Sequence, residues 1–377
     1  MKRVFATANS IVSPLGLNAA DTFTSLKMGK SGLKQINPDF LTNPTYASVF
    51  SNELWKEIEA ATSQYNLKSR FEQLLLKPIL DVIKSSGLDA SDKGVILVIA
   101  TTKGNIDDLG KQPESQLLLS HSAHNIANAM GCKNIPIVVS NACISGLSAI
   151  ITAHRLLKSG FYHTAIVAGA DVLGKFIISG FNALNAMSTE PCRPFDHNRQ
   201  GINLGEGSAA LILQLKETRS ENDIEILGGC VTNDANHVSA PSRTGEELAT
   251  AISSALAEAS LEAGDLQFVS AHGTATLYND EMEAKALNIA GISHLPTHSL
   301  KGFFGHTLGA AGLIESIVCF HSLIHKEFIA SAGFEQQGTS VPVNICTNKT
   351  EISAGAAIKT MAGFGGCNAA LVFSSGS

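Results

Sequence analysis

The stretch IPIVVSNACISGLSAIITAHRLLKSG, residues 135–160, joins a strand-like apolar run to a helical segment of small and aliphatic residues. Cys143 lies at the junction, so we expect its sulfur at the N-terminus of a helix. The helix dipole and the free backbone N–H groups there favour a thiolate and would lower the pKa of the thiol. For Cys143 alone, a buried and unreactive cysteine is an equally good interpretation. Residues much further along the chain decide between the two.

Composition limits the class of protein. The chain has 377 residues, of which 44% are hydrophobic, enough for two domains or one large fused domain. The net charge is −6, and the sequence lacks the clustered Lys and Arg of a nucleic-acid binder. We therefore expect no nucleic-acid partner. The seven cysteines show no metal-binding spacing, and their odd number is typical of a reduced, cytoplasmic protein without a metal.

Neither a signal peptide nor a membrane span is expected. The apolar run in MKRVFATANSIVSPLG, residues 1–16, is broken by Thr, Asn and Ser, which favours a first strand and turn. No uninterrupted apolar stretch approaches the ~20 residues that a membrane-spanning helix needs.

Strand-like runs alternate with helical patterns along the chain. We expect strands at 94–102, 135–141, 163–171, 208–215, 267–273 and 369–374, and helices at 67–86, 119–130, 144–159, 246–262 and 307–324. Several helices should end at a glycine, namely Gly87, Gly131, Gly160 and Gly264. The alternation predicts an α/β fold with parallel strands.

The two halves of the chain echo each other. The first leads a strand into Cys143 and an apolar helix, and the second leads residues 294–306 into His306 and the apolar segment 307–323. Neither helix has a polar face, so both should be buried in the middle of a layered sandwich. We expect duplicated halves, 1–218 and 219–377, whose central helices begin at one cleft.

The residues His272, Lys301 and His306 give Cys143 a chemical context. A thiolate attacks a thioester to form an acyl enzyme. A Cys–His hydrolase needs one histidine with an orienting Asn or Asp, whereas two neutral histidines could donate hydrogen bonds to an enolate. We expect the helix N-terminus to hold His306 neutral. The competing interpretations are a core histidine for His272 and a solvated lysine for Lys301.

Two further features support this constellation. Glu315 lies within the second apolar helix, and a buried carboxylate requires a partner, for which Lys301 is the available cation. The glycines of GFGG, residues 363–366, allow close backbone approach, so the N–H groups of Phe364 and Cys143 could form an oxyanion hole. An ordinary hairpin is the alternative for this turn.

These motifs resemble those of β-ketoacyl-[acyl-carrier-protein] synthases, the elongating type II ketosynthases of the thiolase superfamily. IVSPLG, NACISG, VAGAD, GINLGEGSAAL, SAHGTATLYNDEMEAKAL, KGFFGHTLGAAG and GFGGCN occur in the family's order over nearly the whole chain. The resemblance implies a thiolase-like α/β fold in which duplicated halves form a five-layered αβαβα sandwich.

The resemblance also implies an activity and its residues. The reaction would be decarboxylative Claisen condensation in fatty-acid, polyketide or polyene elongation, with Cys143 as acyl acceptor. His272 and His306 would promote decarboxylation of a malonyl thioester, supported by Lys301. The resemblance also implies that Thr274, Thr276 and Ser239 bind the phosphopantetheine arm. It implies that Phe364 acts as a gate and that Phe181 shapes the acyl pocket.

The implied partner is an acyl carrier protein, whose phosphopantetheine carries the substrates, so no permanently bound cofactor is expected. A homodimer is implied, with a heterodimer as the alternative and residues 163–171 near the subunit interface. Candidates for carrier docking are Lys68, Arg70, Arg193 and Arg199.

Some positions depart from the family pattern. Cys367 stands where the family usually has Thr and is not expected to be catalytic, and Met361 and Ala362 replace polar and aromatic residues before the gate. The alternative functions are a non-catalytic chain-length partner, the catalytic half of a heterodimer, and an acyltransferase or thioesterase that never condenses.

Overall fold

The protein is described by a computed structural model that covers residues 2–235 and 240–376. The chain runs twice through one pattern of elements, strand, helix, strand, helix, strand, helix, strand, strand. The first round consists of β1 (Arg3–Val12), α3 (Arg70–Ser86), β4 (Val95–Ala100), α4 (Leu119–Ala129), β5 (Ile137–Val139), α5 (Ser145–Lys158), β6 (Thr164–Asp171) and β8 (Gly207–Lys216). The second round consists of β9 (Ile224–Asn233), α7 (Glu246–Ala259), β10 (Leu266–Ser270), α8 (Leu277–Ile289), β11 (Thr297–His298), α10 (Ala311–His325), β14 (Ala356–Gly363) and β15 (Cys367–Ser374).

Shorter elements decorate this repeat. They are α1 (Ala19–Lys27), β2 (Leu33–Ile36), β3 (Thr45–Ser48), α2 (Asn52–Thr62), α6 (Lys175–Ala183), β7 (Leu204–Gly205), α9 (Lys301–Phe304), β12 (Glu327–Phe328) and β13 (Thr350–Glu351). Of these, α6 and α9 approach the site described below.

Within the described residues, the strands of both rounds form one ten-stranded sheet in the order β11-β10-β14-β15-β9-β1-β8-β6-β4-β5. Each half has the same strand order and directions. In each half the last strand, β8 or β15, is antiparallel to both of its neighbours. The remaining pairs within the halves are parallel: β4 pairs with β5 and with β6, and β10 pairs with β11 and with β14. The halves meet where β1 pairs with β9, with Phe5 opposite Glu225.

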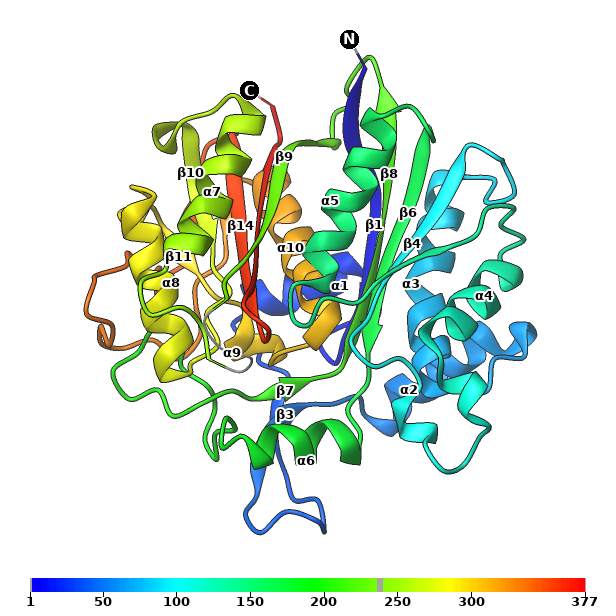
Figure 1. Ribbon diagram of the computed structural model, residues 1–377, viewed down its shortest axis with the longest axis horizontal. Coiled ribbons are helices and arrows are strands. Elements are labelled where there is room, and N and C mark those ends of the chain that lie inside the picture. Colours follow the sequence, from blue (N-terminus) through cyan, green and yellow to red (C-terminus); the bar gives the residue numbers. More distant parts are fainter. Residues whose placement is uncertain (1, 236–239, 377) are drawn as a thin grey trace.

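The sheet encloses a middle layer of two helices. Helix α5 contacts β4, β6 and β8 on one side and β9 and β15 on the other, while α10 contacts β8 and β1 and also β10 and β14. Helices α3 and α4 cover the outer face of the first half, and α7 and α8 cover that of the second (Figure 1). The predicted five-layered αβαβα arrangement is therefore confirmed. The domain division at residue 218 stays a prediction, because the sheet runs continuously through both halves.

Helix α10 shows why the middle layer is stable. All its residues from Ala311 to Phe320 are buried, and the segment Leu308–His325 is apolar and long enough by composition to cross a membrane. In the structure 83% of that segment is buried inside the protein. Its side chains contribute to the largest apolar cluster, which fills the space between the sheet halves.

Most predicted elements lie within a few residues of the observed ones, and one predicted helix end is wrong. Gly87, Gly131 and Gly160 have positive φ angles and follow their helices as expected. Helix α7 instead ends at Ala259, and its cap is Ser260 with φ of 56°. Gly264 belongs to a separate helical turn that Glu262 and Asp265 cap.

Glycines allow the two central helices to cross closely. A Cβ atom on Gly146 of α5 would lie 2.8 Å from the carbonyl oxygen of Gly309. A Cβ atom on Gly312 of α10 would lie 2.5 Å from the backbone nitrogen of Leu147. These distances are shorter than van der Waals contact, so the crossing requires both glycines.

The crossing predicts a stability effect. Gly312→Ala should lower the free energy of unfolding by about 1–3 kcal/mol, because the added methyl group forces the two backbones apart. Urea unfolding followed by circular dichroism measures this change. The control is Gly264→Ala, where a Cβ atom has no neighbour within 4 Å and stability should hold within about 0.5 kcal/mol. Equal stability of both variants would contradict the packing argument.

Candidate active site

Cys143 lies on a tight turn between β5 and α5. Ala142 before it has φ of 43°, a left-handed conformation that is rare for residues other than glycine. Ser145 stabilises the turn, since its hydroxyl accepts from the N–H of Asn141 and donates to the carbonyl of Ala142. The turn presents Cys143 to a cavity just before the first turn of α5, as expected.

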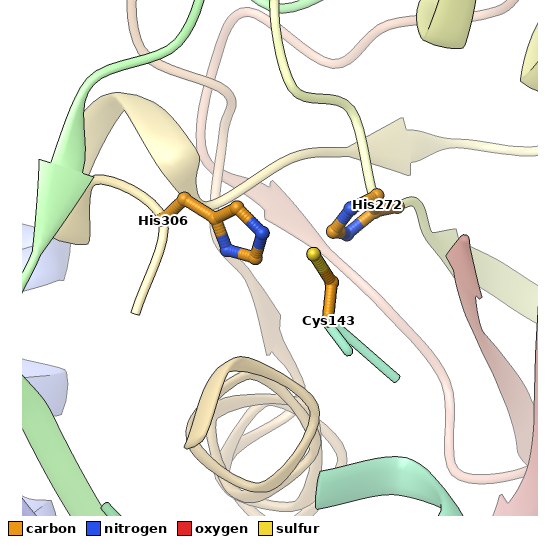
Figure 2. Close-up of side chains that lie close together, drawn as sticks. All are labelled: Cys143, His272 and His306. Carbon is orange, nitrogen blue, oxygen red and sulfur yellow. The ribbon is translucent and has the colours of Figure 1, made fainter. Parts of the chain in front are cut away.

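Two histidines from the second half of the chain face this cysteine. His272 follows β10 and His306 follows α9, and each is 1% exposed. Their ring centroids are 5.1 Å apart with an interplanar angle of 78°. The ligand atoms of Cys143, His272 and His306 all lie within 4.8 Å of one another, and the side chains point toward a common centre (Figure 2). One thioester carbonyl can contact all three.

The same three atoms are also of the types that bind Zn²⁺. No other group of three such ligands is found among residues 2–235 and 240–376. The expectation that the protein has no metal stays a prediction.

The expected lowering of the Cys143 pKa is wrong. Burial raises the pKa of this thiol to about 11, against the opposing effects of the Lys301 ammonium and the backbone N–H of Phe364. Because the sulfur is almost completely removed from water, desolvation of the thiolate outweighs these favourable contacts. The free protein therefore holds a neutral thiol near pH 7, which must lose its proton during attack.

Both imidazoles are neutral, but for a different reason from the one expected. Burial and the ammonium charge of Lys301 hold the pKa values of His272 and His306 well below 6.5, with Lys359 adding to the effect. His306 does not begin a helix, because α10 starts only at Ala311. Its Nδ1 atom accepts the N–H of Leu308 at 3.3 Å, so the proton of the neutral ring lies on Nε2.

A buried chain of charges lies beside the imidazoles. Lys301 donates to Oε1 of Glu315, which is the contact expected from the sequence. Lys359 lies 2.7 Å from Oε2 of the same carboxylate and is 0% exposed. Burial opposes ionisation of Glu315, yet Lys301 and Lys359 together hold its pKa below the usual value. Lys359 was not among the site residues expected from the sequence. A lysine inside the apolar run AAIKTMAG does indicate a buried charge.

A second carboxylate that the sequence reasoning missed fixes the backbone at His272. Glu283 on α8 accepts the N–H groups of His272 and Gly273, each at 2.7 Å, and the hydroxyl of Thr360 at 2.8 Å. These contacts hold the turn after β10 in place. A charged residue on the buried face of the segment EMEAKAL was the available signal.

The cavity above Cys143 has a volume of about 310 Å³. Its walls include most of the residues expected from the family resemblance, namely Thr274, Thr276, Phe181, Phe364, His272 and His306. The hydroxyl groups of Thr274 and Thr276 are 2.8 Å apart. Ser239 lies outside the described residues, although the following Ala240 and Pro241 line the cavity.

The GFGG turn serves two purposes. It is the hairpin between β14 and β15, and it also approaches the cysteine, since a Cβ atom on Gly363 would lie 3.1 Å from the backbone nitrogen of Cys143. The N–H groups of Phe364 and Cys143 both stabilise negative charge on the sulfur. The rings of Phe364 and Phe181 are 5.7 Å apart. Cys367 packs behind the turn, and burial raises its pKa to about 12.

One expectation about surfaces needs correction. Arg199 is 7% exposed and donates to the carbonyls of Asp196 and Gly338, so it is not free to bind a partner. Strand β6, residues 164–171, lies between β4 and β8 and is entirely buried. The expectation that residues 163–171 lie near a subunit interface stays a prediction. The sheet edge in this half is β5. Lys68 and Arg70 are exposed, and Arg193 pairs with Glu335 at 3.2 Å.

The pKa of Cys143 leads to a prediction. Alkylation of this thiol by iodoacetamide should become about tenfold faster per pH unit between pH 7 and 9, because the thiolate fraction rises that steeply below a pKa of about 11. Peptide mass mapping distinguishes Cys143 from the half-buried Cys132, Cys230 and Cys346. A rate that levels off below pH 8 would show that the sulfur is already ionised.

The comparisons with known proteins agree with this geometry. The sequence profile of the beta-ketoacyl synthase N-terminal domain matches residues 1–219, and that of the C-terminal domain matches residues 224–335. The 3-oxoacyl-[acyl-carrier-protein] synthase 2 of Staphylococcus aureus is 27% identical over 407 residues, covering 99% of this chain and 98% of the relative.

Solved structures of ketosynthases are also similar to this chain. A beta-ketoacyl synthase from Burkholderia phymatum superposes with a TM-score of 0.88 at 25% identity, covering 99% of both chains. A ketosynthase from Xenorhabdus doucetiae, solved in complex with its chain length factor, has a TM-score of 0.87 at 26% identity, covering 99% of this chain and 98% of the other. The chain therefore belongs to the β-ketoacyl synthase family, whose members are acyltransferases with a thiolase-like fold.

Proposed function

We propose that this protein joins an acyl group held on Cys143 to a malonyl thioester delivered by an acyl carrier protein. The product is a 3-oxoacyl thioester two carbons longer, with release of CO₂. The observation that carries the proposal is the convergence of one thiol and two neutral imidazoles within 4.8 Å in one cavity. The substrates arrive on phosphopantetheine, and no resident cofactor takes part.

Acyl transfer is the first half-reaction. The sulfur of Cys143 attacks the acyl thioester and the carrier leaves as a thiol, so one thioester replaces another. The proton of Cys143 passes to the leaving sulfur. His272 suits this relay, because its Nδ1 has no hydrogen-bond partner among the described residues. The N–H groups of Phe364 and Cys143 stabilise the tetrahedral oxyanion.

Decarboxylation and condensation form the second half-reaction. The bond between the malonyl α-carbon and its carboxylate breaks, CO₂ leaves, and the electron pair forms an enolate. His306 donates its Nε2 hydrogen to the enolate oxygen, and His272 supports the same oxygen from the other side of the cavity. The α-carbon then attacks the acyl carbonyl, the bond to the Cys143 sulfur breaks, and the departing thiolate takes a proton from water.

The geometry argues against a hydrolase. Activation of water requires an imidazole that a carboxylate or amide orients through its second nitrogen. Among the described residues, His272 Nδ1 has no hydrogen-bond partner, and His306 Nδ1 accepts a backbone N–H. Among the described residues, neither ring therefore has the orienting carboxylate or amide of a Cys–His hydrolase. The intact nucleophile likewise argues against a non-catalytic chain-length partner.

The acyl chain would extend past Phe181. This residue lines the cavity and also packs against an apolar cluster formed by Ile177, Ile178, Leu204 and Leu308. The ring of Phe181 lies 5.7 Å from the ring of Phe364 at the cavity wall. Their movement would admit the chain. Thr274 and Thr276 suit the amide groups of the phosphopantetheine arm at the mouth, where Leu277 and Tyr278 are exposed.

We also propose a second subunit along β5. Residues Ile137, Val138 and Val139 of this edge strand are half-buried, and Ile135 before it is 77% exposed. An open apolar strand edge is a site for pairing with another chain. A second copy and a chain length factor both fit, and the Xenorhabdus doucetiae complex favours the second. Lys68, Arg70 and Arg193 remain the candidates for carrier docking. The seven free cysteines suit the reducing cytoplasm.

The nucleophile can be tested directly. Incubation with acyl-loaded carrier protein should add one acyl group to Cys143, seen by mass spectrometry of the intact protein and its peptides. Cys143→Ala should take up none, because no other cysteine among the described residues lines the cavity. Acylation of any other residue, or of the variant, would remove the central assignment.

Loss of His306 should slow the two half-reactions to different extents. His306→Ala should slow CO₂ release from malonyl carrier protein by at least about 100-fold, since one donor to the enolate is lost. Acylation of Cys143 should fall by less than about tenfold, because the thiol and both N–H donors remain. Rapid-quench assays of each step measure the ratio. Equal losses in both steps would contradict the proposed roles.

A further inference from the structure

Lys359 is a fully buried lysine that the reaction described above does not use. It lies in the middle of β14, and its side chain is 0% exposed. Removal of an ammonium group from water is costly unless oxygen atoms replace its hydration shell. The contacts of this side chain therefore indicate what it does.

The ammonium group of Lys359 meets three oxygen atoms. It lies 2.7 Å from Oε2 of Glu315, donates to the carbonyl of Ala271 at 2.9 Å, and donates to the carbonyl of Ser270 at 3.3 Å. The two carbonyl contacts are hydrogen bonds and the carboxylate contact is an ion pair, so oxygen atoms surround the buried ammonium group. Two of the three oxygens belong to the residues that directly precede His272.

These contacts connect the two histidine segments. On one side, Lys359 holds the end of β10, from which His272 projects. On the other side, Glu315 also binds Lys301, the first residue of α9, and α9 leads to His306. One chain of contacts, from the Ala271 carbonyl through Lys359, Glu315 and Lys301, thus spans from one imidazole to the other.

We propose that Lys359 is a positioning residue that clamps the His272 segment onto Glu315 and so sets the distance between the two imidazoles. The inference rests on the proposed function, because it assigns Lys359 to the step in which both rings contact one oxygen. A small displacement of either donor would weaken that contact far more than the attack of Cys143.

The surrounding charges support this role. The carboxylate of Glu315 faces the ammonium groups of Lys301 and Lys359, and the Lys359 charge also acts on Glu283. Lys359 is also one of the charges that keep the pKa values of His272 and His306 low. Glu283 fixes the backbone N–H of His272 while Lys359 fixes the carbonyl groups before it. The segment is therefore held from both sides.

The test compares Lys359→Met with wild type in the two half-reactions, using the full chain and acyl- and malonyl-loaded carrier protein. Methionine keeps an unbranched side chain as far as Cε but removes the charged nitrogen and its three N–H groups. Acylation of Cys143 should stay within about threefold, and CO₂ release should fall by about 100-fold. The control is Lys285→Met, which removes a partly exposed lysine paired with Glu281 at 3.4 Å and should leave both steps unchanged.

Chemical rescue distinguishes positioning from general stability. Lys359→Ala leaves space for a small cation between the same three oxygens, so added methylammonium should restore CO₂ release at least about tenfold while acylation stays constant. If Lys359→Met does not fold, Lys359→Arg replaces it, and loss of CO₂ release with acylation retained supports the proposal.

Three results would overturn it: unchanged CO₂ release in a folded variant, equal loss of both steps, and no rescue by methylammonium. Absence of CO₂ release from wild type would instead overturn the proposed function, whatever the variants do.

Discussion

Glu315 places a carboxylate in the middle layer of the protein, where its side chain is 2% exposed and lies between the ammonium groups of Lys301 and Lys359. A lone charge there would be strongly destabilising, whereas a carboxylate with two cationic partners is tolerated. This contact joins α10 to α9 and to β14, and through them to the segments of both histidines. The positive charge beside the rings also disfavours imidazolium, so both histidines remain hydrogen-bond donors.

The duplicated fold explains why the site forms between the halves. In each half the third strand leads toward the start of a central helix, and the two helices cross at Gly146 and Gly312. Cys143 precedes one of these helices and His306 lies a few residues before the other, so the crossing brings them together. His272 joins them from the end of β10. A nucleophile from one half and donors from the other can thus be combined without a long loop.

The parts of this arrangement differ in how far they follow from sequence. The strand and helix runs, the burial of residues 311–320 and the contact of Lys301 with Glu315 follow from apolar patterning and from the need to pair a buried charge. The pKa of Cys143 does not, because it depends on how completely the fold excludes water, and local sequence carries no measure of that. The role of Lys359 could not be predicted for a similar reason, since its oxygen partners come from segments that are remote in the chain. Arg199 resembled a surface charge because its two carbonyl acceptors are assembled only by the fold.

The account requires a neutral thiol between two neutral imidazoles, with the His306 proton on Nε2. Neutron diffraction from crystals exchanged into D₂O at neutral pH shows these protons directly. The account predicts deuterium on Nε2 of His306 and none on its Nδ1, a single deuterium on the His272 ring, and a deuterated sulfur on Cys143. Deuterium on both nitrogens of either ring beside a bare Cys143 sulfur would establish a thiolate–imidazolium pair and contradict it.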